Sequence, residues 1–169
     1  MEQASAYTAA VLDLLGSADP MRVLQDTPSA LSRRIDGLTP AQLSQPEVAG
    51  KWSITQVLQH LADSELVCGY RLRMVLAHDR PPITGYDQDL WATRLRYQDA
   101  DPQQAIHEFT VVRQANVRLL SRAPAEDLKR VGVHAERGEE SVAHMIRLYA
   151  GHDLLHLKQI ERIRRTVSQ

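Results

Sequence analysis

The sequence predicts an all-α fold, a four-helix bundle with an additional N-terminal helix. Turn-forming Pro and Gly residues divide the chain into long blocks, and within these blocks apolar residues recur at helical spacing. None of the segments between the blocks alternates with the period of a strand. At 169 residues the chain has the commonest size of one domain, so we expect a single helical bundle domain over residues 1–169.

Local signals place the ends of the predicted helices. Ser53 and Gln56 have the spacing of a capping box, Asp101 precedes a Pro suited to a first helical turn, and Ser141 is a good N-cap. Gly37 is a suitable C-cap. The first two helices are either separate or one helix kinked at a Pro. The expected ranges are 4–16, roughly 21–37, 54 to the Pro81-Pro82 pair, 102 to about 122, and 142 to about 165.

The connection over residues 79–101 is long, aromatic and rich in Pro for a link between helices. We expect it to turn back along the bundle and to line a substrate pocket with Tyr86, Asp87 and Trp91. Asp87 could alternatively cap a helix, and the two aromatic side chains could simply seal the core.

Charge and composition exclude several classes of partner. The 20 Lys and Arg residues nearly balance the 21 Asp and Glu residues, so the surface has no overall field that would attract nucleic acid or anionic lipid. No stretch is long and apolar enough for a membrane helix, and the N-terminus does not resemble a signal peptide. Cys68 is the single cysteine, which excludes an internal disulfide. We therefore expect a cytoplasmic protein with a small-molecule substrate.

Two histidines occupy positions where apolar residues are expected. The apolar stripe of the last helix is centred on His152 and His156, which lie one turn apart. Their ring nitrogens could converge on one divalent transition metal at about 2.0–2.1 Å, with His60 of an earlier helix as the best third ligand. The alternative is a pair of core histidines satisfied by hydrogen bonds. Imidazole suits several metals, so the spacing does not select the ion.

Glu65 is a further candidate for the same site. Glu65 lies inside an apolar stripe, so it either forms a core salt bridge with an arginine such as Arg113 or Arg71, or acts as an acid or base beside the metal. The residues expected on the surface or in ordinary packing are His78, His107, His134, His144, Asp63 and Asp153.

Three motifs in order carry a family resemblance: KWSITQVLQHLADSE, the segment from Tyr86-Asp87 to Trp91, and AGHDLLHLKQI. Together they resemble the DinB-like superfamily, and within it the YfiT-like branch of metal-dependent hydrolases, over roughly residues 20–163. The resemblance implies a four-helix bundle that binds nickel or zinc through His60, His152 and His156. Some members are thiol S-transferases that join a low-molecular-weight thiol such as bacillithiol to an electrophile.

The functional expectation follows from this resemblance and from the open ligand positions that three histidines leave on a metal. We expect a thiol S-transferase, with a metal-dependent hydrolase or a non-catalytic metal-binding module as alternatives. Glu65 and Arg113, where close relatives carry histidine, are the candidate catalytic residues. The resemblance also implies a homodimer, for which exposed apolar residues of the N-terminal helix would provide a surface; these are Val11, Leu14 and Leu15.

Overall fold

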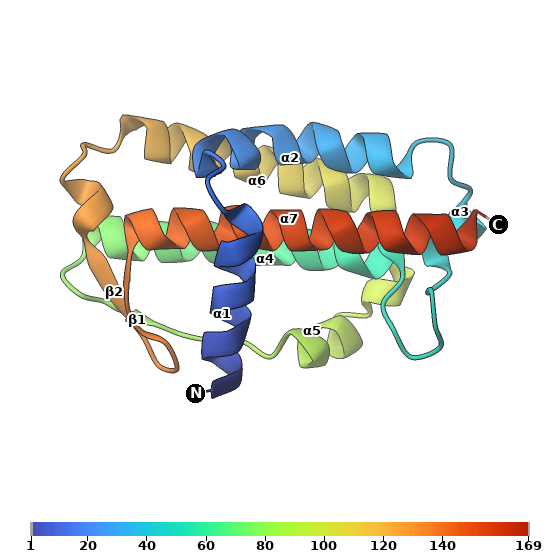
Figure 1. Cartoon of the computed structure of the whole chain (residues 1–169), viewed down its shortest axis with the longest axis horizontal. Coiled ribbons are helices and arrows are strands. Elements are labelled where there is room, and N and C mark those ends of the chain that lie inside the picture. Colours follow the sequence, from blue (N-terminus) through green and yellow to red (C-terminus); the bar gives the residue numbers. More distant parts are fainter. Residues whose placement is uncertain (1, 169) are drawn as a thin grey trace.

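The computed structural model describes residues 2–168, with side chains from residue 6 onward, and is a four-helix bundle with an additional N-terminal helix (Figure 1). This confirms the predicted fold. The bundle helices are α2 (Pro20–Ile35), α4 (Ile54–Ala77), α6 (Pro102–Arg122) and α7 (Val142–Val167), and the additional helix is α1 (Glu2–Leu15). The shorter helices are α3 (Pro40–Ser44), α5 (Gln88–Arg94), η1 (Tyr97–Asp99) and η2 (Asp127–Lys129). Within residues 2–168, no helix combines the length and apolarity needed to cross a bilayer.

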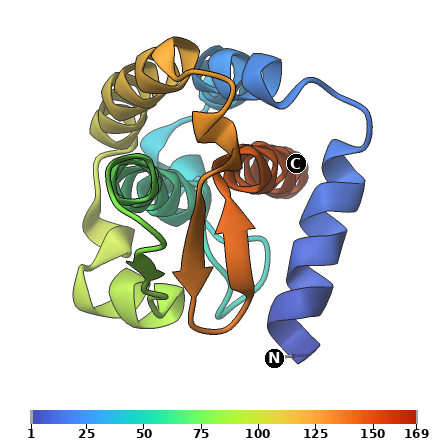
Figure 2. The same cartoon turned by 90° about the vertical axis from the view of Figure 1, so that its left-hand side faces the viewer.

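The four long helices form a closed ring, in which α2 contacts α6 and α7, and α4 contacts the same two helices (Figure 2). Figure 1 shows that α4 and α6 run in one direction while α2 and α7 run in the other. Because α4 and α6 are parallel, the chain between them must return along the whole bundle. Residues 78–101 make this return, as the length of the connection predicted.

Side-chain caps begin the bundle helices where the sequence predicts. The Ser53 hydroxyl accepts from the Gln56 N–H at 3.4 Å, and the Gln56 side-chain oxygen accepts from the Ser53 N–H at 2.9 Å. Asp101 accepts from the N–H of the second residue of α6 at 2.8 Å, and Ser141 caps α7 in the same manner. Asp19 caps α2, so α1 and α2 are separate helices. These caps fix where α4 and α7 begin, and burial of their apolar stripes determines which side chains face inward.

A small three-stranded sheet covers one end of the bundle, and here the expectation of no strands was wrong (Figure 2). Its strands are β1 (Pro82–Ile83), β2 (Val131–His134) and β3 (Gly138–Ser141), with β1 parallel to β2 and β2 antiparallel to β3. Strands of two to four residues are too short to show a period-2 pattern. Gly138, the first residue of β3, has a φ of +78°, which lets the chain turn from β2 into β3.

Helix α1 crosses the outside of α7 (Figure 1). Val11 and Leu15 are buried and Leu14 is half-buried, so the expectation that they are exposed was wrong. Their apolar surface is covered by the chain itself and provides no face for a second copy. The homodimer stays a prediction without this support.

Candidate metal centre and its cavity

Three histidines converge from two antiparallel helices. His60 is in the second turn of α4, and His152 and His156 are one turn apart on α7. The Nε2 atom of His152 lies 3.1 Å from the Nε2 atom of His60 and 3.1 Å from that of His156. The structure thus brings together the three residues predicted as ligands.

The spacing of these nitrogens fits a metal better than hydrogen bonds. An imidazole nitrogen carries either one hydrogen or one lone pair, so Nε2 of His152 cannot make a good hydrogen bond to both neighbours at once. Three nitrogens at 2.0–2.1 Å from a tetrahedral zinc ion would be about 3.3 Å apart. The 3.1 Å separations are close to this value, and one cation would accept all three lone pairs.

The surroundings keep the three rings in the form that binds a metal. The side-chain oxygen of Gln159 lies 2.8 Å from Nδ1 of His156 and accepts its hydrogen, which leaves the lone pair on Nε2. Burial lowers the pKa of His60 to about 3, that of His152 well below its ordinary value, and that of His156 as well. All three rings are therefore neutral at physiological pH, as metal ligands must be.

No fourth protein ligand joins the cluster among the described residues, where the grouped His, Cys, Asp and Glu side chains are these three histidines alone. Asp63, on the neighbouring turn of α4, is half-buried and accepts from the Tyr97 hydroxyl at 2.5 Å and from Gln59 at 3.3 Å. A cation held by three protein ligands keeps positions open for a substrate, as catalytic sites do.

Glu65 and Arg113 form a buried ion-pair cluster with Asp153. Arg113 binds Asp153 with both terminal nitrogens, at 2.5 and 3.1 Å, and Glu65 at 2.8 Å. Asp153 is only 1% exposed, so its prediction as a surface residue was wrong. Although burial disfavours the charged guanidinium, the two carboxylates outweigh this effect and raise the pKa of Arg113. The core salt bridge considered for Glu65 is present, and neither Glu65 nor Arg113 lines the cavity described next.

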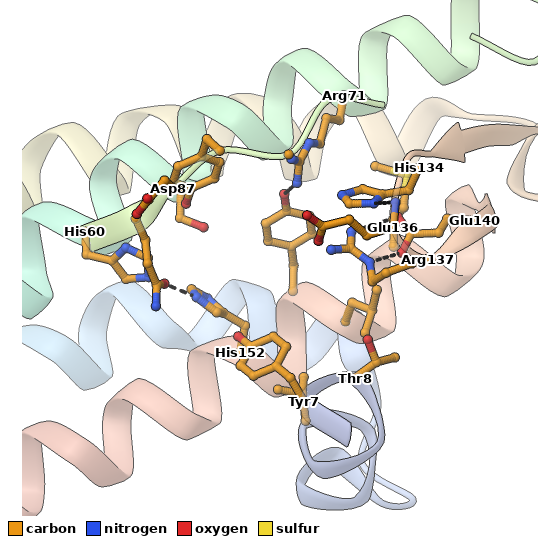
Figure 3. A pocket seen from close by; sticks show the side chains of 18 residues that line it. Tyr7, Thr8, His60, Arg71, Asp87, His134, Glu136, Arg137, Glu140 and His152 are labelled. Atoms are coloured by element: carbon orange, nitrogen blue, oxygen red, sulfur yellow. Dashed lines mark hydrogen bonds and ion pairs between the residues drawn. The ribbon is translucent and has the colours of Figure 1, made fainter. Parts of the chain in front are cut away.

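The histidines open onto a cavity of about 690 Å³ between α1, α4, α7 and the two connections at that side of the bundle. His60 and His152 are in its wall, and so are Tyr86 and Asp87 of the 79–101 connection (Figure 3). Trp91 is not in the wall but packs against Tyr86, with ring centroids 4.5 Å apart. Asp87 also caps α5, since it accepts from two backbone N–H groups at 2.9 and 3.0 Å.

Much of the wall was not predicted from the sequence. The unpredicted residues with polar side chains include Tyr7, Ser64, Arg71, His134, Glu136, Arg137, Glu140 and Tyr149. His134 was expected in ordinary packing or on the surface, but it is buried in the wall, and it was missed because it belongs to the unpredicted hairpin. Arg71 could have been found, because it follows His60 by 11 residues and therefore lies on the same face of one helix.

Comparisons with known proteins agree with this fold, and the names of the relatives refer to a metal. The model of the DinB superfamily matches residues 24–160. A Bacillus cereus protein named "Putative metal-dependent hydrolase" is 29% identical over 145 residues, which are 86% of this chain and 83% of the relative. A Bacillus anthracis protein of the same name is 28% identical with the same coverage. The solved structure of YfiT from Bacillus subtilis, described as "a probable metal-dependent hydrolase with an unusual four-helix bundle topology", aligns with a TM-score of 0.81 and 26% identity, covering 86% of this chain and 84% of that one.

Proposed function

Because the chain belongs to the DinB superfamily, we propose that it is a metal-dependent enzyme that transfers a low-molecular-weight thiol to an electrophile. The observation that carries the proposal is a cluster of three neutral histidines opening onto a cavity of about 690 Å³. Such a volume lies within the range of small-molecule sites, about 300–1,000 Å³. A purely structural metal site has four protein ligands, and here three converge among the described residues.

His60, His152 and His156 would hold the metal. When bound, a divalent transition metal supplies Lewis-acid chemistry that lowers the pKa of a coordinated thiol or water. In the proposed reaction the thiol sulfur forms a bond to the electrophilic carbon, the leaving group departs with the electron pair of its bond, and the thiol proton passes to solvent. The products are a thioether, the leaving group with its electron pair, and the proton released to solvent.

The reacting thiol must come from a second substrate. The single cysteine, Cys68, is buried in the helical core, and burial raises the pKa of its thiol well above the ordinary value. A protonated, buried thiol is a poor nucleophile. A thiol co-substrate of low molecular weight therefore fits the site better than a covalent intermediate on the protein.

Two contacts favour thiol transfer over hydrolysis. Attack by water needs a base to remove a proton during bond formation, whereas a thiol that is already ionised does not. Asp63 follows His60 by three residues and accepts from the Tyr97 hydroxyl, and Asp153 follows His152 directly and is paired with Arg113. Hydrolysis remains the second candidate, since the relatives from Bacillus cereus and Bacillus anthracis are named as hydrolases.

A metal analysis followed by a conjugation screen tests the proposal. The protein is reconstituted with zinc or nickel and incubated with bacillithiol, cysteine or glutathione and the electrophile monobromobimane, and the thioether is measured by mass spectrometry. We expect thiol-dependent product formation that falls by about two orders of magnitude in His156→Ala. His144→Ala provides a matched control, because His144 lies on the same helix but outside the cluster.

Two results would contradict thiol transfer. Loss of an ester or amide substrate at the same rate with and without thiol would identify a hydrolase. A bound metal that exchanges no ligand and supports no turnover with any thiol would identify the non-catalytic module.

A further inference from the structure

The protein buries two arginines with very different surroundings. Arg113 is paired with two carboxylates inside the bundle. Arg71 of α4 is 8% exposed and lines the cavity, yet no carboxylate lies within ion-pair distance of it among the described residues. A buried charge without a counter-charge is unfavourable, so this guanidinium is suited to an anionic partner from outside the protein.

The protein contacts of Arg71 are all with neutral groups. One terminal nitrogen donates to the Tyr149 hydroxyl at 3.1 Å, and the other donates to the backbone oxygen of Thr84 at 2.5 Å. The guanidinium also lies 6.0 Å from the ring centroid of Tyr86. Its Nε–H is buried and has no partner in the described part of the chain. These contacts orient the side chain without neutralising it.

His134 provides a second free donor in the same part of the cavity. Its Nδ1 accepts from the Glu136 N–H at 3.1 Å, so the ring hydrogen is on Nε2. His134 is 2% exposed, lines the cavity, and its Nε2 has no partner among the described residues. An unsatisfied buried donor is unfavourable by about 1–3 kcal/mol, unless a ligand accepts its hydrogen.

The carboxylates in the cavity wall do not fill this role. Glu140 is paired with Arg137, at 2.5 and 3.0 Å, and Asp87 caps α5. Glu136 is exposed. Arg71 is therefore the buried positive charge that the wall leaves without a partner.

The position of Arg71 relates it to the candidate metal centre. His60 and Arg71 are 11 residues apart on α4, which corresponds to about 16 Å along the axis and about 20° of rotation. Figure 3 shows His60 and His152 at one side of the cavity and Arg71 and His134 at the other. A substrate lying between them would have its reacting group at the histidines and a second polar group at Arg71.

We propose that Arg71 and His134 form a subsite that binds a carboxylate of the substrate, at the side of the cavity opposite the histidine cluster. The guanidinium edge formed by Nε and its neighbouring nitrogen matches the two oxygens of a carboxylate, and the His134 N–H adds a third donor. The inference rests on the proposed function, because it assigns the thiol or the electrophile an acidic group separated from the reacting atom.

Binding of matched thiols tests the subsite. Isothermal titration calorimetry is performed on the zinc-loaded protein with 6-mercaptohexanoate and with 6-mercaptohexanol, which differ only in the terminal group. We expect the acid to bind the wild-type protein about tenfold more tightly than the alcohol. In Arg71→Gln this preference should disappear while the affinity for the alcohol stays unchanged.

Gly85→Ala gives a second test that leaves Arg71 in place. A Cβ at Gly85 would lie 3.9 Å from Nε2 of His134 and would partly cover that donor. We expect it to reduce the preference for the acid without changing the affinity for the alcohol. This variant decides the question if Arg71→Gln fails to fold.

The outcomes separate this inference from the proposed function. Equal binding of acid and alcohol to the wild-type protein would overturn the subsite. So would a preference for the acid that persists in Arg71→Gln, because the carboxylate would then be bound elsewhere, for example at the metal. If the preference depends on Arg71 but no thiol is conjugated to monobromobimane, the subsite stands and the S-transferase activity does not.

Discussion

Arg113 connects its own helix, α6, to three other helices through one guanidinium. It binds Glu65 of α4 and Asp153 of α7, and it donates to the backbone oxygen of Leu24 in α2 at 3.0 Å. Asn116, one turn further along α6, donates to the other oxygen of Glu65 at 2.8 Å. Each carboxylate in this cluster depends on Arg113 for its counter-charge.

Substituting Arg113 alone should therefore be strongly destabilising. Arg113→Ala leaves two buried carboxylates without a cation, and we expect it to lower the free energy of unfolding by about 3–5 kcal/mol. Urea denaturation followed by circular dichroism measures the change.

The triple variant Arg113→Met/Glu65→Leu/Asp153→Leu is the control for this prediction. It removes the three charges together and puts apolar side chains in their place, so it should be more stable than Arg113→Ala. A triple variant as unstable as the single one would mean that packing, and not the uncompensated charge, accounts for the loss.

Gln159 is predicted to orient a metal ligand. Its side-chain oxygen accepts from Nδ1 of His156, and such outer partners typically contribute a factor of about 10–100 in metal affinity. Gln159→Leu should weaken zinc binding by about this factor, measured by competition with a chromophoric chelator. Gln159→Glu keeps an acceptor at the same position and should retain most of the affinity for zinc. Equal zinc affinities of the wild-type protein, Gln159→Leu and Gln159→Glu would show that the contact with His156 has no influence on metal binding.

The sequence predicted correctly those site residues whose pattern lies within a few neighbouring positions of the chain. His152 and His156 are four residues apart on one helix, so their spacing and the apolar stripe around them are enough to indicate a site. Asp153 was misplaced because its partner Arg113 is 40 residues away, and the helical wheel does not show long-range charge pairing. The same holds for His134, whose neighbours in the cavity wall come from four other segments of the chain.

At the scale of elements, the contact between α1 and α7 is unusually close. A Cβ added at Gly151 would overlap the backbone oxygen of Val11, so the two helices approach each other at a position where a side chain does not fit. Gly151 directly precedes His152, and α1 contributes Tyr7, Thr8 and Val11 to the cavity wall. This glycine therefore sets how α1 covers the cavity.

Gly151→Ala should destabilise the protein although alanine is the better helix former. We expect the overlap to lower the free energy of unfolding by about 1–3 kcal/mol, against a gain of about 1 kcal/mol from helix propensity. Thermal denaturation measures the net change. Ala143→Gly, at an exposed position of the same helix, measures the effect of helix propensity alone. An increase in melting temperature for Gly151→Ala would show that α1 does not pack against α7 at Gly151.

Helices were predicted better than strands because their signals are repeated. The apolar stripes of α4 and α7 extend over 24 and 26 residues, so single exceptions do not obscure them. The strands are formed by pairing between segments far apart, such as Pro82 with Val133, and the sequence of either strand alone contains little of that information.

At the scale of the whole molecule, the parallel arrangement of α4 and α6 shapes the site. It requires a connection that runs the length of the bundle, and this connection brings Tyr86 and Asp87 to the cavity (Figure 1). The histidine cluster in turn joins α4 to α7 across 92 residues of sequence. A metal bound there would link two helices that the backbone connects only indirectly.

Metal binding should therefore stabilise the entire fold. Because the three rings converge only in the folded chain, free metal at about 1,000 times its dissociation constant would add about 4 kcal/mol to the free energy of unfolding. We expect the wild-type protein to melt at a lower temperature after treatment with a chelator and to recover when zinc is added back. Differential scanning calorimetry measures the shift.

His156→Ala separates this effect from any general influence of zinc. The variant keeps the helical bundle but lacks one ligand, so its melting temperature should be nearly the same with and without metal. His107→Ala, at an exposed position of α6, should respond to zinc as the wild-type protein does. If chelation leaves the melting temperature of the wild-type protein unchanged while elemental analysis shows that a metal has been removed, the ion does not hold α4 and α7 together. The histidine cluster would then bind the metal without stabilising the fold. The bundle would be stabilised by the apolar core and the Arg113 cluster.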